Sequence, residues 1–179
     1  MSDQAVIDRT RRWIANVVIG LNLCPFARRV FDAGAIRYVV STATDDRALL
    51  ADLTTELRTL VSTPIETVET TLLIHPNVLG DFLDYNDFLG NADARIADLG
   101  LEGVVQIASF HPSYRFAESR ADGVENYTNR SPYPMLHLLR EASVSAVAGD
   151  AEEMAKIPSR NVETLRRLGL ERIRELGGP

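Results

Sequence analysis

The sequence predicts a single-domain α/β sandwich over residues 1–179, in which helices flank a small, mainly parallel sheet of at least three strands. Strand-like and helix-like runs alternate along the chain, and this order favours parallel pairing through right-handed crossovers. Hydrophobic residues make up 45% of the chain and charged residues 25%, which is typical of a globular protein with a real core. No linker, repeat or low-complexity tract divides it. An α+β arrangement with one antiparallel strand is the alternative.

The first part of the chain contains three predicted helices and one predicted strand. An amphipathic helix spans residues 3–19, with apolar residues at helical spacing, and Gly20 ends it. A short helix over 25–31 is expected because proline is favoured in a first turn. Residues 36–41 form the first strand, since a tyrosine and two valines favour extended backbone. A helix with a leucine stripe then begins at Asp45.

The next segments complete the predicted sheet. Residues 67–74 form a second strand, whose Leu-Leu-Ile end indicates burial on both faces. A long helix over 79–99 and a third strand over 104–110 follow, and residues 112–131 are polar and irregular.

Two further helices are predicted in the last third of the chain. Ser131 is a suitable N-cap and Pro132 a suitable first residue for a helix over 132–147. A C-terminal helix spans 159–176 and is weakened at Gly169.

The charge balance and the single cysteine restrict the partners and the setting. A net charge of −6 and a pI near 5.1 argue against nucleic acid as a main partner, because phosphate binding needs a dense Lys/Arg face. Cys24 is the only cysteine, so no disulfide forms within the chain and a cytoplasmic setting is expected. The apolar run 13–23 is too short to span a bilayer, so no membrane association is expected. The sequence does not decide the oligomeric state.

Two of the three histidines directly follow predicted strands. His75 stands before Pro76 and His111 before Pro112, and a residue before proline is held in extended backbone. If the strands are parallel, both imidazoles lie at the carboxyl edge of the sheet, where open α/β sheets bind ligands. Both histidines are therefore candidate general acids or bases. The simpler alternative is a histidine that ends a strand and bonds to backbone.

Cys24 and His137 are the remaining candidate catalytic residues. Cys24 precedes Pro25 at the expected start of a short helix, where amide donors and the helix dipole favour a thiolate. His137 lies early in the helix predicted over 132–147, with Glu141 on the same face to orient its ring. The alternatives are a buried cysteine that packs as a small hydrophobe and a surface histidine paired with Glu141.

The polar segment after the third strand supplies candidate substrate-binding groups. Guanidinium groups hold carboxylates or phosphates in a bidentate fork, and amides and phenols add further hydrogen bonds. The candidates are Arg115, Asn126, Tyr127, Asn129, Arg130 and Tyr133. Each has an ordinary alternative as a turn cap or a packing residue, but their density beside the candidate histidines favours a site.

Three segments resemble those that define a bacterial protein family. They are Leu21-Asn22-Leu23-Cys24-Pro25-Phe26-Ala27, Phe110-His111-Pro112 and the stretch NYTNRSPYPMLHLLR from Asn126 to Arg140. The family is called domain of unknown function 1415, and the resemblance covers nearly the whole chain. It implies a single-domain, bacterial, cytoplasmic protein and brings no activity, substrate or cofactor.

Three functions remain open from the residues. The first is an enzyme that hydrolyses or transfers a group on a small polar or anionic substrate, with His75, His111 and Cys24 in the chemistry. The second is a metal-binding protein, since three histidines and one cysteine suit Zn²⁺, although no short ligand motif is present. The third is a non-catalytic protein that binds a small ligand. Neither a Gly-rich phosphate loop nor a G-x-S-x-G elbow is present.

Overall fold

The computed structural model describes residues 2–147 and 151–179 of the chain. Its elements are α1 (Asp3–Trp13), the π-helical η1 (Ile14–Ile19), α2 (Ala27–Asp32), β1 (Ile36–Val40), α3 (Asp46–Ser62), β2 (Thr70–Ile74), α4 (Phe82–Asp98), β3 (Val105–Phe110), the 3-10 helix η2 (Val124–Thr128), β4 (Met135–Arg140), α5 (Glu141–Val147), α6 (Ala151–Leu168) and α7 (Leu170–Glu175). Capping side chains fix three helix starts, because Ser2, Asp45 and Asp81 accept hydrogen bonds from backbone amides of the first turn.

In the described part of the chain, four strands form one mixed sheet in the order β1-β2-β4-β3. β1 and β2 are parallel, whereas β4 runs antiparallel to both of its neighbours, β2 and β3. The predicted α/β class with flanking helices is confirmed. The prediction of a mainly parallel sheet is wrong, and the alternative with one antiparallel strand describes the pairing found. β1, β2 and β3 consequently run in the same direction.

β4 occupies part of the segment predicted to be a helix over 132–147. Residues Met135–Arg140 form the strand, and the helix begins only at Glu141. Methionine, leucine and arginine favour helices intrinsically, so the local sequence indicates a helix. The sheet overrides that preference, because β4 completes the backbone hydrogen bonds of both β2 and β3. His137 therefore lies on a central strand.

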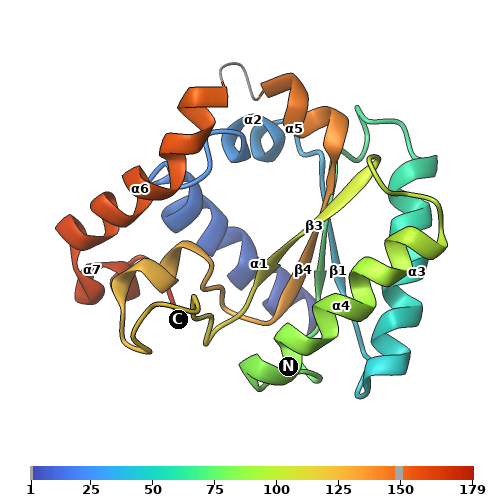
Figure 1. Ribbon diagram of the computed structural model, residues 1–179, viewed down its shortest axis with the longest axis horizontal. Coiled ribbons are helices and arrows are strands. Elements are labelled where there is room, and N and C mark those ends of the chain that lie inside the picture. Colours follow the sequence, from blue (N-terminus) through green and yellow to red (C-terminus); the bar gives the residue numbers. More distant parts are fainter. Residues whose placement is uncertain (1, 148–150) are drawn as a thin grey trace.

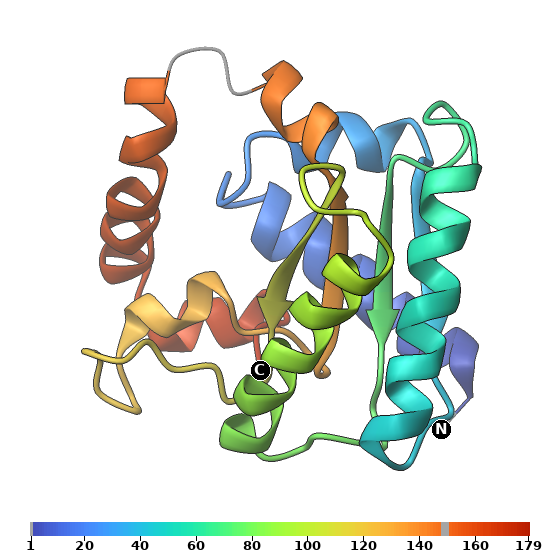
Figure 2. The same ribbon diagram turned by 45° about the vertical axis from the view of Figure 1, so that its right-hand side comes forward.

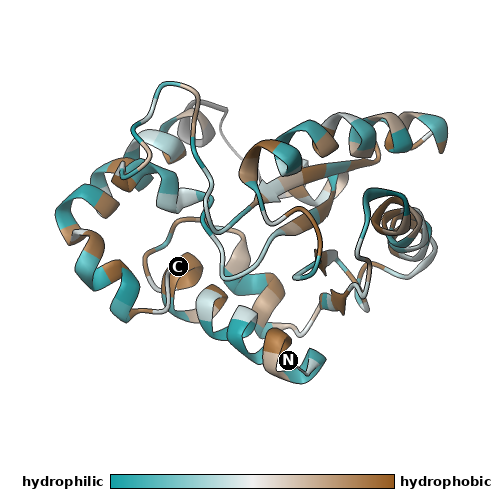
Figure 3. Cartoon of the chain, turned by 90° about the horizontal axis from the view of Figure 1, so that it is seen from below, coloured by the Kyte–Doolittle hydropathy of each residue, from teal (hydrophilic) through white to brown (hydrophobic). Residues whose placement is uncertain are grey.

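Helices cover both faces of this sheet (Figure 1). α3 and α4 lie side by side over one face (Figure 2), on a core that includes Leu136 and Leu138. α1 lies over the other face, on a second core that includes Trp13 and Met135. Hydrophilic and hydrophobic residues alternate along the surface helices (Figure 3), as expected of helices with one buried face. Because side chains alternate along a strand, His137 shares the α1 face with Met135.

The first helix changes geometry before it ends. α1 continues into the π-helical η1, and Gly20 follows. A Cβ atom at Gly20 would lie 2.1 Å from the carbonyl oxygen of Asn16, so a larger residue requires the backbone to move. Single π-helical turns are frequent at functional sites. Here the π-helical segment leads directly into the loop that carries Cys24.

The C-terminal helices lie on the α1 side of the molecule (Figure 1). α6 begins earlier than the predicted residue 159, and Gly169 separates it from α7 with a φ of +82°. α6 contacts η2, and Leu165 and Ile173 join the core that includes Trp13. None of the helices in residues 2–147 and 151–179 combines the length and apolar character that a membrane span requires.

Candidate functional site

His75 and His111 come together at the carboxyl edge of the sheet, because β2 and β3 run in the same direction. The ring centroids of the two histidines lie 5.8 Å and 5.1 Å from that of Tyr85 in α4. Neither histidine has exposed surface. Both rings therefore lie at the predicted edge of the sheet, where α4 packs against them and encloses them in the core.

Both histidines hold the turn between β2 and α4. His75 Nδ1 donates to the carbonyl oxygen of Val78 and His111 Nε2 to that of Leu79, each at 3.1 Å. The backbone amide of Ser113 donates to His111 Nδ1 at 3.0 Å, which fixes the tautomer of that ring. Leu79 has a φ of +56°, a conformation that strains a leucine, and the hydrogen bond from His111 restrains it.

Burial keeps both rings neutral. The pKa of His75 is lowered to about 4, chiefly because burial desolvates the charged ring, and the pKa of His111 is lowered for the same main reason. His75 Nε2 is buried without a partner in the described chain. These features fit the simpler alternative of histidines that end strands and bond to backbone. Their role in acid-base catalysis stays a prediction.

His137 lies on the opposite face of the sheet, and its tautomer is fixed by Thr70. The Thr70 hydroxyl donates its single proton to the carbonyl oxygen of Leu138 at 2.6 Å. His137 Nε2, which lies 2.7 Å from the same hydroxyl, must therefore donate to it and leave a lone pair on Nδ1. Thr70, and not the predicted Glu141, orients this ring. Burial lowers the pKa of His137 to about 4, so the ring is neutral.

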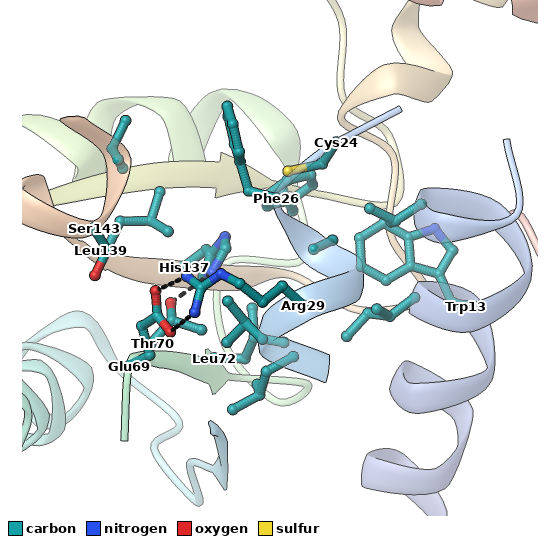
Figure 4. A pocket seen from close by; sticks show the side chains of 17 residues that line it. Trp13, Cys24, Phe26, Arg29, Glu69, Thr70, Leu72, His137, Leu139 and Ser143 are labelled. Atoms are coloured by element: carbon teal, nitrogen blue, oxygen red, sulfur yellow. Dashed lines mark hydrogen bonds and ion pairs between the residues drawn. The ribbon is translucent and has the colours of Figure 1, made fainter. Parts of the chain in front are cut away.

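A cavity of about 120 Å³ lies between the sheet and helices α1, α2 and α5 (Figure 4), and we term it the inner cavity. Most of its lining is apolar and includes Trp13, Ile14, Phe26, Val30, Leu72 and Phe110. Its polar lining residues are Cys24, Arg29, Glu69, Thr70, His137 and Ser143. Two of the predicted catalytic residues, Cys24 and His137, thus line one cavity.

Some polar groups of the inner cavity have hydrogen-bond partners within the protein and others do not. Arg29 pairs with Glu69 through two hydrogen bonds, so these charges compensate each other. No partner binds His137 Nδ1 within residues 2–147 and 151–179, and Ser143 Oγ and Trp13 Nε1 are buried without partners in the same part of the chain. Figure 4 shows the benzene half of the Trp13 ring toward the cavity and the indole nitrogen on the far side.

Cys24 is partly buried in the loop before α2. Backbone amides of Phe26 and Ala27 donate hydrogen bonds to its sulfur, which favours the thiolate. Burial outweighs them and raises the pKa of the Cys24 thiol above its ordinary value. The predicted thiolate is therefore disfavoured, and Cys24 is a neutral thiol at physiological pH.

A larger space of about 560 Å³ lies beside the inner cavity, and we term it the outer groove. Val18, Cys24 and Phe110 line both spaces. The outer groove is more polar, and its polar lining includes Glu118, Ser119, Glu125, Thr128, Asn129, Asn161 and Arg166. Cys24 therefore lies where a mainly apolar space meets a polar one.

Two predicted substrate-binding asparagines have different surroundings. Asn129 lines the outer groove. Asn126 is fully buried, where its Oδ1 accepts from the Phe116 amide and the Ser119 hydroxyl and its Nδ2 donates to the Arg120 carbonyl. Asn126 thus holds the loop that borders the outer groove.

The other predicted substrate-binding residues are distributed between loop, core and solvent. Arg130 donates to two backbone carbonyls of its own loop, and its guanidinium carbon lies 4.7 Å from the centroid of the Tyr127 ring. Tyr127 and Tyr133 are buried core residues, and Arg115 is exposed. A role of these four residues in binding substrate stays a prediction.

The predicted zinc ligands do not converge in the described chain. His75 and His111 contact α4, whereas His137 and Cys24 line the cavity on the α1 side. No group of three His, Cys, Asp or Glu side chains in residues 2–147 and 151–179 is arranged to hold a metal ion. The metal-binding hypothesis therefore lacks a shared site among these residues.

Sequence reasoning missed several residues of the inner cavity. Thr70 carried no signal, because a threonine in a strand is ordinary. Trp13 was assigned to the apolar stripe of a helix, and Ser143 to the middle of a predicted helix. A search for polar residues on otherwise apolar faces would have found Ser143, but neither Thr70 nor the cavity that joins the two residues.

Comparison with known protein families matches residues 5–175 to a family described as "Protein of unknown function (DUF1415)". The match spans nearly the whole chain and confirms the resemblance carried by the three segments. No curated protein and no solved structure matches the chain.

Proposed function

The chain belongs to the family described as Protein of unknown function (DUF1415), whose description assigns no activity, and we propose that it binds a small, mainly apolar molecule in the inner cavity. The observation that carries this proposal is an apolar cavity with an unpartnered acceptor, His137 Nδ1, among its lining groups. Small-molecule sites combine apolar walls with a few such polar groups. A cytoplasmic, bacterial setting is part of the same proposal and is supported by the single cysteine and the family resemblance.

The balance of proton affinities favours binding over thiol catalysis. Transfer of the Cys24 proton to His137 would run from a thiol whose pKa is raised by burial to an imidazole whose pKa is lowered to about 4. Both shifts oppose the transfer. Activated cysteines instead have lowered pKa values. A neutral thiol and a neutral imidazole in the lining of one cavity therefore suit the binding of an uncharged ligand better than nucleophilic catalysis.

Trp13 provides a direct assay, because it is the only tryptophan in the sequence and lines the inner cavity. We expect toluene, an uncharged probe, to change Trp13 fluorescence saturably and to raise the thermal midpoint. The Ala27→Leu variant should lose both effects, since Ala27 lines the cavity and a larger side chain would occupy part of it.

The matched control is Ala33→Leu, because Ala33 is exposed at the end of the same helix. This variant should bind toluene as the wild-type protein does. The proposal would be overturned by a fluorescence change that rises linearly with toluene concentration without saturating. An equal change in the wild-type protein and in Ala27→Leu would also overturn it.

A thiol-dependent enzyme acting on a small molecule is the second candidate function. One observation favours it: Cys24 and His137 line the same cavity, so a bound substrate would be accessible to both. Iodoacetamide labelling of Cys24 between about pH 6 and pH 8 separates the two candidates. Labelling faster than in urea-unfolded protein would favour the enzyme, whereas slower labelling is expected of the neutral, partly buried thiol.

A further inference from the structure

The inner cavity presents one hydrogen-bond acceptor of fixed polarity. Thr70 uses its only proton on the carbonyl oxygen of Leu138, so the proton of His137 is held on Nε2. His137 Nδ1 therefore offers a lone pair, and no described residue donates to it. A ligand group that complements this atom must be a donor, such as a hydroxyl or an N–H.

The cavity also selects against charge. Arg29 and Glu69 neutralise each other within the lining, and the remaining polar groups, Cys24, Thr70, His137 and Ser143, are uncharged. A carboxylate or ammonium group placed there would lose its hydration without gaining an opposite charge. A neutral ligand avoids this cost.

The size and walls of the cavity suit a single ring. Its volume of about 120 Å³ is similar to that of an engineered apolar cavity of about 150 Å³ that binds benzene. Aromatic side chains of Trp13, Phe26 and Phe110 contribute to the walls, and the Phe110 ring centroid lies 6.1 Å from that of His137. A ring bound in this cavity can therefore pack against aromatic side chains.

From these three features, and resting on the proposed function, we infer that the inner cavity binds a neutral, ring-containing molecule whose hydroxyl or N–H group donates to Nδ1 of His137. The ligand class is thus phenol-like, as opposed to a plain hydrocarbon or an anion. Ligands with polar substituents on the ring would extend toward the outer groove.

Titrations with phenol, anisole and toluene test this inference, because the three probes have similar rings and differ in the polar group. Only phenol carries a donor. Affinities are measured from Trp13 fluorescence in wild type and in His137→Phe. The ratio of phenol affinity to toluene affinity should fall roughly five- to tenfold in the variant, as expected for loss of one hydrogen bond.

Thr70→Val supplies a second test that keeps the imidazole. Without the Thr70 hydroxyl, nothing holds the ring proton on Nε2, and the proton can move to Nδ1. The preference for phenol over anisole should then weaken, because anisole can accept a hydrogen bond from Nδ1 but cannot donate one. Circular dichroism spectra of both variants establish that they are folded.

The outcomes separate the inference from the proposed function. If toluene binds saturably but the phenol-to-toluene ratio is unchanged in His137→Phe and the phenol-to-anisole ratio is unchanged in Thr70→Val, the ligand class is wrong and the proposed function stands. If none of the three probes binds the wild-type protein, the inferred ligand class and the proposed function are both overturned. If benzoate binds more tightly than phenol, the selection against charge is wrong, and with it the inferred class.

Discussion

Acidification should destabilise this protein through His75, and the size of the effect follows from burial. The pKa of His75 is lowered from 6.5 to about 4. The unfolded chain therefore takes up a proton at a higher pH than the native protein, so the free energy of unfolding falls as the pH drops from about 6.5 to about 4. The full loss is about 3 kcal/mol, of which about 2 kcal/mol is lost by pH 5. This is a large part of the roughly 5–15 kcal/mol that stabilises a typical domain.

The His75→Asn variant isolates this contribution in urea unfolding at pH 7 and at pH 5. The asparagine amide can donate to the Val78 carbonyl in place of Nδ1 but does not titrate. It loses packing against Tyr85 at both pH values, so the measured quantity is the change in unfolding free energy between them. The wild-type protein should lose about 2 kcal/mol more than the variant, since His111 and His137 titrate in both. Equal losses would refute the reasoning, because His75 would then not be a desolvated, neutral ring.

Two further predictions concern the segments around the candidate site. Gly20→Ala should lower the free energy of unfolding by about 1–3 kcal/mol, because its Cβ would meet the carbonyl oxygen of Asn16. The control Gly90→Ala, whose Cβ meets nothing within 4 Å in α4, should instead stabilise by up to about 1 kcal/mol in thermal melts. Asn126→Ala should increase hydrogen-deuterium exchange in residues 114–123, because three hydrogen bonds to that loop are lost. Unchanged exchange there would show that Asn126 does not hold the loop.

Local sequence patterns predicted most elements but could not predict the position of β4. The leucine stripe after Asp45 and the apolar run before His75 depend on neighbours close in sequence, and both formed the expected helix and strand. MLHLLR has no such local signature of a strand, since its residues favour a helix. It becomes extended because β2 and β3, distant in sequence, leave a gap in the sheet that only a strand can fill.

Residues 135–140 form a strand and not the predicted helix, and this difference also explains which parts of the site were predictable. The residue types at Cys24 and His137 suggested chemistry, but a helical His137 would have lain on a different surface. As part of β4 it projects to the α1 face, where η1 and the following loop bring Cys24 to the same cavity. His75 and His111 were placed at the correct edge of the sheet, yet the packing of Tyr85 against them was not evident from spacing.

Two features of the inner cavity together define what it can bind. Its walls are mainly apolar, so an apolar ring is removed from water when it enters. His137 Nδ1 has no donor among the described residues, so a ligand hydroxyl or N–H can bind it. A leucine at Ala27 would occupy part of the space, whereas a phenylalanine at His137 would remove the acceptor, so the two variants test the two features separately.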